Sequence, residues 1–145
     1  MKVTGLYVEE RNDSNTKEAV SFALKYFHDL KCETEEGQLS DNIFGTDIAL
    51  LAVPYAGLHI ASGYETVIDK LNKNQKVHWL LMLTKDDVSG KSERKIDDLA
   101  LALKERGTLD ILRFDNMTSE RYVPLQTREM MEIMRVCDQI HKHYQ

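Results

Sequence analysis

Two uninterrupted apolar runs of strand length constrain the fold of this chain more than any other feature. Residues 48–53 read IALLAV, and residues 77–83 read VHWLLML. Runs of this length and composition are typical of central strands whose faces are both covered by other elements. The rest of the chain must therefore supply helices for both faces of a sheet.

Strand and helix patterns alternate along the chain. Strands are predicted over residues 3–8, 32–36, 48–53, 77–83 and 109–114, with the acidic second strand best suited to an edge position. Helices are predicted over residues 15–30, 62–71, 96–103 and 130–144, and one or two further helical turns over residues 39–44. This alternation predicts an α/β fold, a doubly wound three-layer sandwich around a parallel sheet.

The last helix is predicted to bury one stripe. Apolar side chains recur along it at helical spacing. The predicted stripe is Met130, Ile133, Met134, Cys137, Ile140 and Tyr144.

Composition predicts one ordinary globular domain, residues 1–145, and excludes several classes of function. The chain is 42% hydrophobic and 30% charged with a net charge of −5, and its lysines and arginines are scattered, so a nucleic-acid surface is not expected. No apolar run reaches membrane-spanning length, and no secretory pattern opens the chain, which predicts a cytoplasmic protein without a membrane partner.

The cysteines and histidines do not predict a metal site. Cys32 and Cys137 are far apart without metal-ligand spacing, and we expect both to be thiols that fill space in the core. The histidines form no zinc pattern with carboxylates, and His141 and His143 suit the carbonyl end of the last helix.

A polar loop, residues 9–14, joins the first strand to the first helix. Asn15 and Glu18 have the spacing of a reciprocal helix cap, so the helix is predicted to begin there. Its free N–H groups suit an anion such as a phosphate, although such loops also precede helices merely because their residues cap them. Arg11 is the only cation nearby, and Asp13 adds negative charge. The candidate anion-binding residues are Arg11, Asn12, Ser14, Asn15 and Thr16.

In an open parallel sheet, ligands lie beyond the carboxyl ends of the strands where the strand order reverses. The loops predicted at that edge are residues 9–16, 54–61, 84–92 and 115–123. The second of these loops offers Tyr55 and His59, whose flat side chains can lie against an aromatic ring. A planar ligand that carries a phosphate is therefore predicted.

Three short motifs resemble the flavodoxin-like proteins, and in particular the NAD(P)H-dependent FMN reductases. They are Arg11-Asn12-Asp13-Ser14-Asn15-Thr16, Pro54-Tyr55-Ala56-Gly57 and Ile68-Asp69-Lys70-Leu71. The resemblance implies a five-stranded sheet of order 2-1-3-4-5. It also implies an FMN-binding electron carrier, or an NAD(P)H-dependent reductase of a flavin or quinone. A redox partner protein and a homodimer are further implied possibilities.

By this resemblance the first motif holds the FMN phosphate, and the second borders the isoalloxazine ring. The loop from Thr84 to Gly90 closes the other side of the ring. This chain departs from the family in placing Tyr55 directly after Pro54 and in lacking paired glycines in the Thr84 loop. The cofactor-binding residues so implied are Arg11, Asn12, Ser14, Asn15, Thr16, Pro54, Tyr55, Ala56, Gly57, Thr84 and Gly90.

Three alternatives to the flavoprotein are considered. A cofactor-free binding or regulatory module of the same fold remains open. A phospho-receiver would need an aspartate at the end of the third strand, where Pro54 stands. A P-loop hydrolase is indicated only by Gly90-Lys91-Ser92, without the glycine that should precede it. No catalytic residue is assigned in any of these cases.

Overall fold

The computed structural model describes residues 1–7, 15–54, 63–84, 101, 109–114 and 124–144. These residues contain a five-stranded sheet of order β2-β1-β3-β4-β5, in which every neighbouring pair is parallel. The strands are β1 Lys2–Tyr7, β2 Glu33–Gln38, β3 Ile48–Pro54, β4 His78–Thr84 and β5 Leu109–Phe114. The predicted strand order and the edge position of the second strand are both confirmed.

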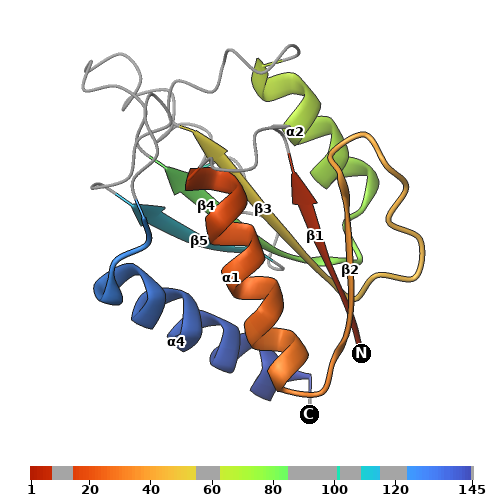
Figure 1. The fold of residues 1–145 in the computed structure, drawn as a ribbon. Coiled ribbons are helices and arrows are strands. Elements are labelled where there is room, and N and C mark those ends of the chain that lie inside the picture. The colour runs from red at the N-terminus through yellow and green to blue at the C-terminus, as the bar shows by residue number, and fades with distance from the viewer. Residues whose placement is uncertain (8–14, 55–62, 85–100, 102–108, 115–123, 145) are drawn as a thin grey trace.

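Helices cover both faces of the sheet (Figure 1). Helices α1 (Asn15–Asp29) and α4 (Thr127–His143) pack on one face, and α2 (Gly63–Lys73) packs on the other. Of the helix predicted near residues 96–103 the structure describes Leu101, which is helical and 66% exposed. The three layers of the predicted sandwich are therefore present.

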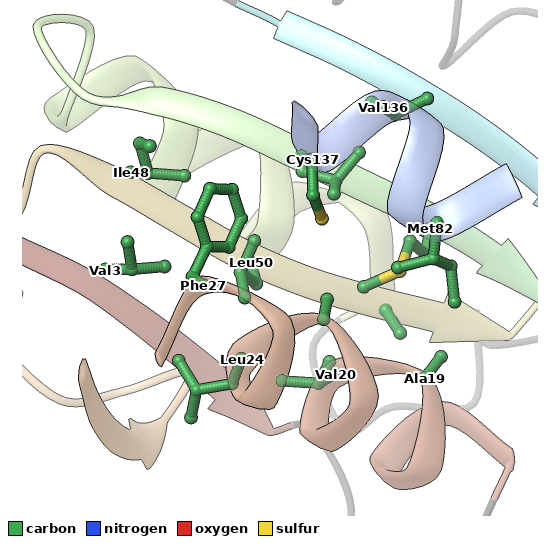
Figure 2. Packing of buried hydrophobic residues seen from close by; sticks show 14 of the residues in the cluster. Val3, Ala19, Val20, Leu24, Phe27, Ile48, Leu50, Met82, Val136 and Cys137 are labelled. Atoms are coloured by element: carbon green, nitrogen blue, oxygen red, sulfur yellow. The ribbon is translucent and has the colours of Figure 1, made fainter. Parts of the chain in front are cut away.

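The central strands are apolar throughout because both of their faces are buried. From Ile48 to Ala52, alternate residues of β3 pack under α1 and α4, where Figure 2 shows Phe27 and Cys137 lying over Leu50. The residues between them pack under α2, and every residue from Ile48 to Val53 is at most 4% exposed. Both cysteines are buried free thiols, as predicted.

Helix α1 approaches β1 closely at Gly5. A Cβ atom built on Gly5 would lie 2.9 Å from Cγ1 of Val20 and 3.3 Å from Cδ2 of Leu24. Contacts of this length are shorter than two carbon atoms tolerate. Because Gly5 has no side chain, α1 can pack this closely against β1.

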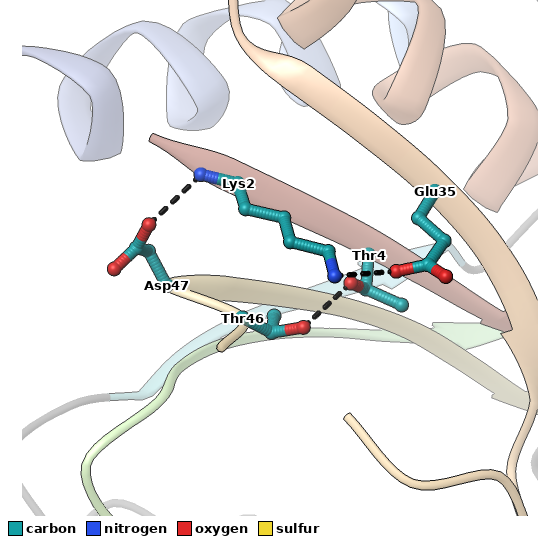
Figure 3. Close-up of polar contacts among 5 residues, drawn as sticks. All are labelled: Lys2, Thr4, Glu35, Thr46 and Asp47. Carbon is teal, nitrogen blue, oxygen red and sulfur yellow. Dashed lines mark hydrogen bonds and ion pairs between the residues drawn. The ribbon is translucent and has the colours of Figure 1, made fainter. Parts of the chain in front are cut away.

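Polar contacts hold the acidic edge strand and the start of β3 to β1 (Figure 3). Nζ of Lys2 pairs with Glu35 of β2 at 2.7 Å, and the backbone N–H of Lys2 donates to Asp47 at 2.8 Å. Beneath them the hydroxyl groups of Thr4 and Thr46 share a buried hydrogen bond of 2.7 Å. Neighbouring segments are thereby joined at the amino-terminal edge of the sheet.

The helical turns predicted over residues 39–44 are wrong. The link from β2 to β3 is irregular, with Ile43 buried and Phe44 87% exposed. This link must return along a six-residue strand, a span of about 20 Å. A helix over residues 39–44 would cover only about 9 Å of this span, and the structure has turns and bends there instead.

The predicted stripe of α4 is correct at Ile133, Cys137 and Ile140, which are buried, and wrong at two other positions. Met134 and Tyr144 are 36% and 41% exposed rather than buried. In their place the helix buries Val136 and, in its first turn, Glu129. A carboxylate on the inner face cannot be recognised from apolar spacing, which is why the pattern missed it.

Candidate functional site

The carboxyl ends of β3, β4 and β5 lie side by side at one edge of the sheet. Pro54 of β3 is paired with Thr84 of β4, which is paired in turn with Phe114 of β5. Between β1 and β3 the strand order reverses, because the chain runs from β1 outward to β2 and then returns across the sheet to β3. Ligands of open α/β sheets bind at this kind of reversal.

The structure brings together part of the predicted site. Pro54 and Thr84 are neighbours in the sheet, and α1 begins at Asn15 as predicted, with Thr16 in its first turn and only 3% exposed. The other predicted residues lie outside the described ranges. They are Arg11, Asn12, Ser14, Tyr55, Ala56, Gly57 and Gly90.

The carboxylate of Glu18, in the first turn of α1, bonds to the segment just ahead of α4. Its Oε1 accepts a hydrogen bond of 3.2 Å from the backbone N–H of Leu125, just ahead of α4, while its Oε2 has no partner. The N–H of Leu125 needs an acceptor, and Glu18 is placed to supply one. This acidic group of the first turn is therefore directed to the α4 side, and the cap predicted from its spacing with Asn15 stays a prediction.

A second cation, which the sequence interpretation missed, lies at the first turn of α1. Nζ of Lys17 lies 5.3 Å from the ring centroid of Tyr7, the last residue of β1. The Tyr7 hydroxyl shares a hydrogen bond of 3.0 Å with Ser21 and donates to Glu36 at 3.2 Å, and burial raises the pKa of Tyr7. Since Lys17 and Ser21 are four residues apart, helical spacing could have placed both beside β1.

A hydrogen-bonded cluster at the opposite, amino-terminal edge has a structural role. His78 lies 2.6 Å from a carboxylate oxygen of Asp110 and 2.9 Å from the hydroxyl of Tyr144. Because a carboxylate only accepts, Nε2 of His78 donates to Asp110, and Nδ1 shares the second hydrogen bond with the hydroxyl of Tyr144. Both ring nitrogens are engaged, so the cluster fastens the end of α4 to the sheet.

Two absences hold for the part of the chain that the structure describes. Its histidines, cysteines, aspartates and glutamates form no group of three or more arranged to hold a metal. None of its helices is both long enough and apolar enough to cross a membrane.

The fold resembles solved flavodoxins along nearly the whole chain. A flavodoxin from Streptococcus pneumonia superposes with a TM-score of 0.63 at 9% identity, over 98% of this chain and 97% of that one. A short-chain flavodoxin associated with a bacterial microcompartment gives 0.60 at 12% identity, over 99% and 97% of the two chains. A flavodoxin from the domain Archaea gives 0.57 at 10% identity, over 99% and 98%.

These likenesses establish the class of fold. The protein has a flavodoxin-like α/β fold, with the strand order that the sequence resemblance implied. The sequence itself matches no protein-family model and no curated protein. The narrower likeness to NAD(P)H-dependent FMN reductases therefore remains a hypothesis drawn from short motifs.

Proposed function

We propose that this protein binds FMN at the carboxyl edge of its sheet and acts as an electron carrier. The observation that carries the proposal is the start of α1 at the point where the strand order reverses, beyond the end of β1. The flavodoxin-like fold supports the same site. A narrower form of the proposal is an NAD(P)H-dependent reductase of a flavin or quinone, working in the cytoplasm with a redox partner protein.

The described residues at this edge fit the phosphate of FMN. The first turn of α1 offers backbone N–H groups directed toward the helix start and the positive end of a 15-residue helix. The carboxylate of Glu18 is engaged with Leu125, while Lys17 adds positive charge beside Tyr7. Thr16 and Lys17, with Arg11 from the preceding loop, would hold the phosphate. Bound FMN would supply the redox chemistry, and the protein its position and electrostatic environment.

The test is a titration of the purified protein with FMN and, in parallel, with riboflavin, which lacks the phosphate. We expect saturable quenching of flavin fluorescence, a yellow protein after gel filtration, and weaker binding of riboflavin. Anaerobic addition of NADH or NADPH then separates a carrier from a reductase, since only a reductase bleaches the bound flavin. A colourless protein that binds neither flavin would overturn the proposal in favour of a cofactor-free module.

Thr16 offers a matched pair of variants at this site. Replacing Thr16→Val removes a hydroxyl while keeping the shape of the side chain, whereas Thr16→Ser keeps the hydroxyl. A hydrogen bond to a charged group contributes about 1.5–3 kcal/mol, so T16V should weaken FMN binding about tenfold to a hundredfold. Riboflavin affinity should change little in either variant. Equal FMN affinity in T16V and T16S would exclude the Thr16 hydroxyl from the phosphate site.

A further inference from the structure

Two carboxylates between α1 and α4 have fewer partners than their burial requires. Glu129 is 5% exposed, and neither of its carboxylate oxygens has a hydrogen-bond partner. Oε2 of Glu18 is likewise buried without a partner. Charged groups buried in proteins are paired, hydrogen-bonded or bound to a cation, and an unsatisfied one calls for a physical explanation.

The contacts between the two helices place these carboxylates along the same stretch of the interface. Glu18 of α1 bonds to Leu125, just ahead of α4, and further along Tyr26 donates to Asp138 at 2.8 Å. The helices therefore run in the same direction, as Figure 1 also shows. Glu129 is one helical turn beyond Leu125 and so lies between these two contacts along α4.

The side chain of Glu129 is on the inner face of its helix. It shares the buried stripe of α4 with Ile133 and Ile140, which pack in the core cluster that also contains Ala19 and Val20 of α1. Glu129 thus lies on the core-facing side of α4, in the helical turn that follows the contact of Leu125 with Glu18.

Both carboxylates lie near the start of a helix. Glu18 and Glu129 each occupy the first turn of a helix, where the helix dipole stabilises a carboxylate. None of the ion pairs formed by the described residues includes either carboxylate.

We propose that Glu18 and Glu129 form a site for one hard divalent cation, of the class of Mg²⁺, Ca²⁺ and Mn²⁺. Carboxylate oxygens are the ligands that these ions prefer, and Mg²⁺ commonly uses one or two carboxylates while keeping several waters. Such a site needs fewer side chains than the groups of three or more that are missing among the described residues. The cation would join the starts of α1 and α4, and the site does not depend on FMN binding.

The experiment uses the flavin-free protein, stripped of metals with a chelator. Thermal unfolding is followed during titration with Mg²⁺, Ca²⁺ and Mn²⁺ separately, and Mn²⁺ binding is counted by electron paramagnetic resonance. At a hundredfold excess over its Kd, a single bound ion should raise Tm by about 5–10 °C. The Mn²⁺ count should reach about one ion per chain, as expected for a single site.

Three glutamine variants separate a real site from general ionic effects. E129Q and E18Q keep the shape of each side chain and should abolish the rise in Tm and the bound Mn²⁺. E132Q is the control, because Glu132 lies on the same helix but is bonded to Arg135 at the surface at 2.7 Å; it should respond as the unaltered protein does. No rise with any of the three ions, or an equal rise in E129Q and E18Q, would overturn the proposal. If E129Q does not fold, E18Q and the Mn²⁺ count on the unaltered chain still decide it.

Discussion

Gly5 is the position where one methyl group should test the packing of α1 on β1. In Gly5→Ala the new Cβ would lie 2.9 Å from Val20 and 3.3 Å from Leu24. Carbon atoms prefer separations of about 3.5–4.0 Å, so the helix or its side chains must move by several tenths of an ångström. The direction of a Cβ atom is fixed by the backbone, so the methyl group cannot rotate away from this contact.

The net effect of G5A is the difference between two opposing contributions. Overpacking a tight core typically costs about 1–3 kcal/mol. Alanine also lowers the conformational entropy of the unfolded chain, which raises the free energy of unfolding by about 0.5–1 kcal/mol. We therefore expect G5A to lower the free energy of unfolding by about 0.5–2 kcal/mol, equivalent to a fall in Tm of roughly 2–6 °C.

Urea unfolding of four proteins provides the assay: the unaltered chain, G5A, Val20→Ala and the double variant. V20A is destabilising because it leaves a small cavity, but it removes the atom nearest to the new methyl group. G5A should therefore cost less in the V20A background, with a coupling energy of about 0.5–2 kcal/mol. Strictly additive effects would refute the close contact of α1 with β1, and so would a G5A protein that is more stable than the unaltered chain.

Two further predictions concern ionisable side chains in the core. Burial raises the pKa of Tyr7 above its ordinary value, so the folded protein retains a proton that the unfolded chain releases, and stability should fall as pH rises above about 10. Tyr7→Phe should reduce this loss of Tm at alkaline pH. Part of the loss should remain, because the pKa values of Tyr26 and Tyr144 are also raised. A pH profile of Tm that is unchanged in the variant would contradict the assignment of the effect to Tyr7. Burial also raises the pKa of the Cys137 thiol, which is 0% exposed, so a Cys32→Ser protein should resist a thiol reagent until urea unfolds it. Rapid labelling of the native C32S protein would show that Cys137 is accessible.

Several elements could be predicted because their signal is local. The apolar run from Ile48 to Val53 has strand length and no polar residue, and burial on both faces explains this composition. The start of α1 at Asn15 could be predicted because residues with short polar side chains precede the helical stripe. Strand order followed from the resemblance of motifs rather than from any local rule.

Other features could not be predicted because they depend on distance across the fold. The segment around Phe44 has helical spacing, yet it must span the length of the sheet, and its backbone forms turns and bends rather than a helix. Glu18 has the spacing of a cap, but its oxygen bonds to Leu125, which is distant in sequence. No local pattern marks Glu129 as buried, since a glutamate in a first helical turn is ordinarily exposed.

The amino-acid sequence by itself determined the class of fold and the edge of the sheet where a ligand would lie. Both follow from periodicity and chain order, which act between residues near one another in sequence. The tertiary structure decided which groups meet: Lys17 lies beside Tyr7, and Glu18 of α1 bonds to Leu125 just ahead of α4. Those encounters depend on how closely helices pack on the sheet, as at Gly5, and packing distances of this kind arise only once the layers are assembled.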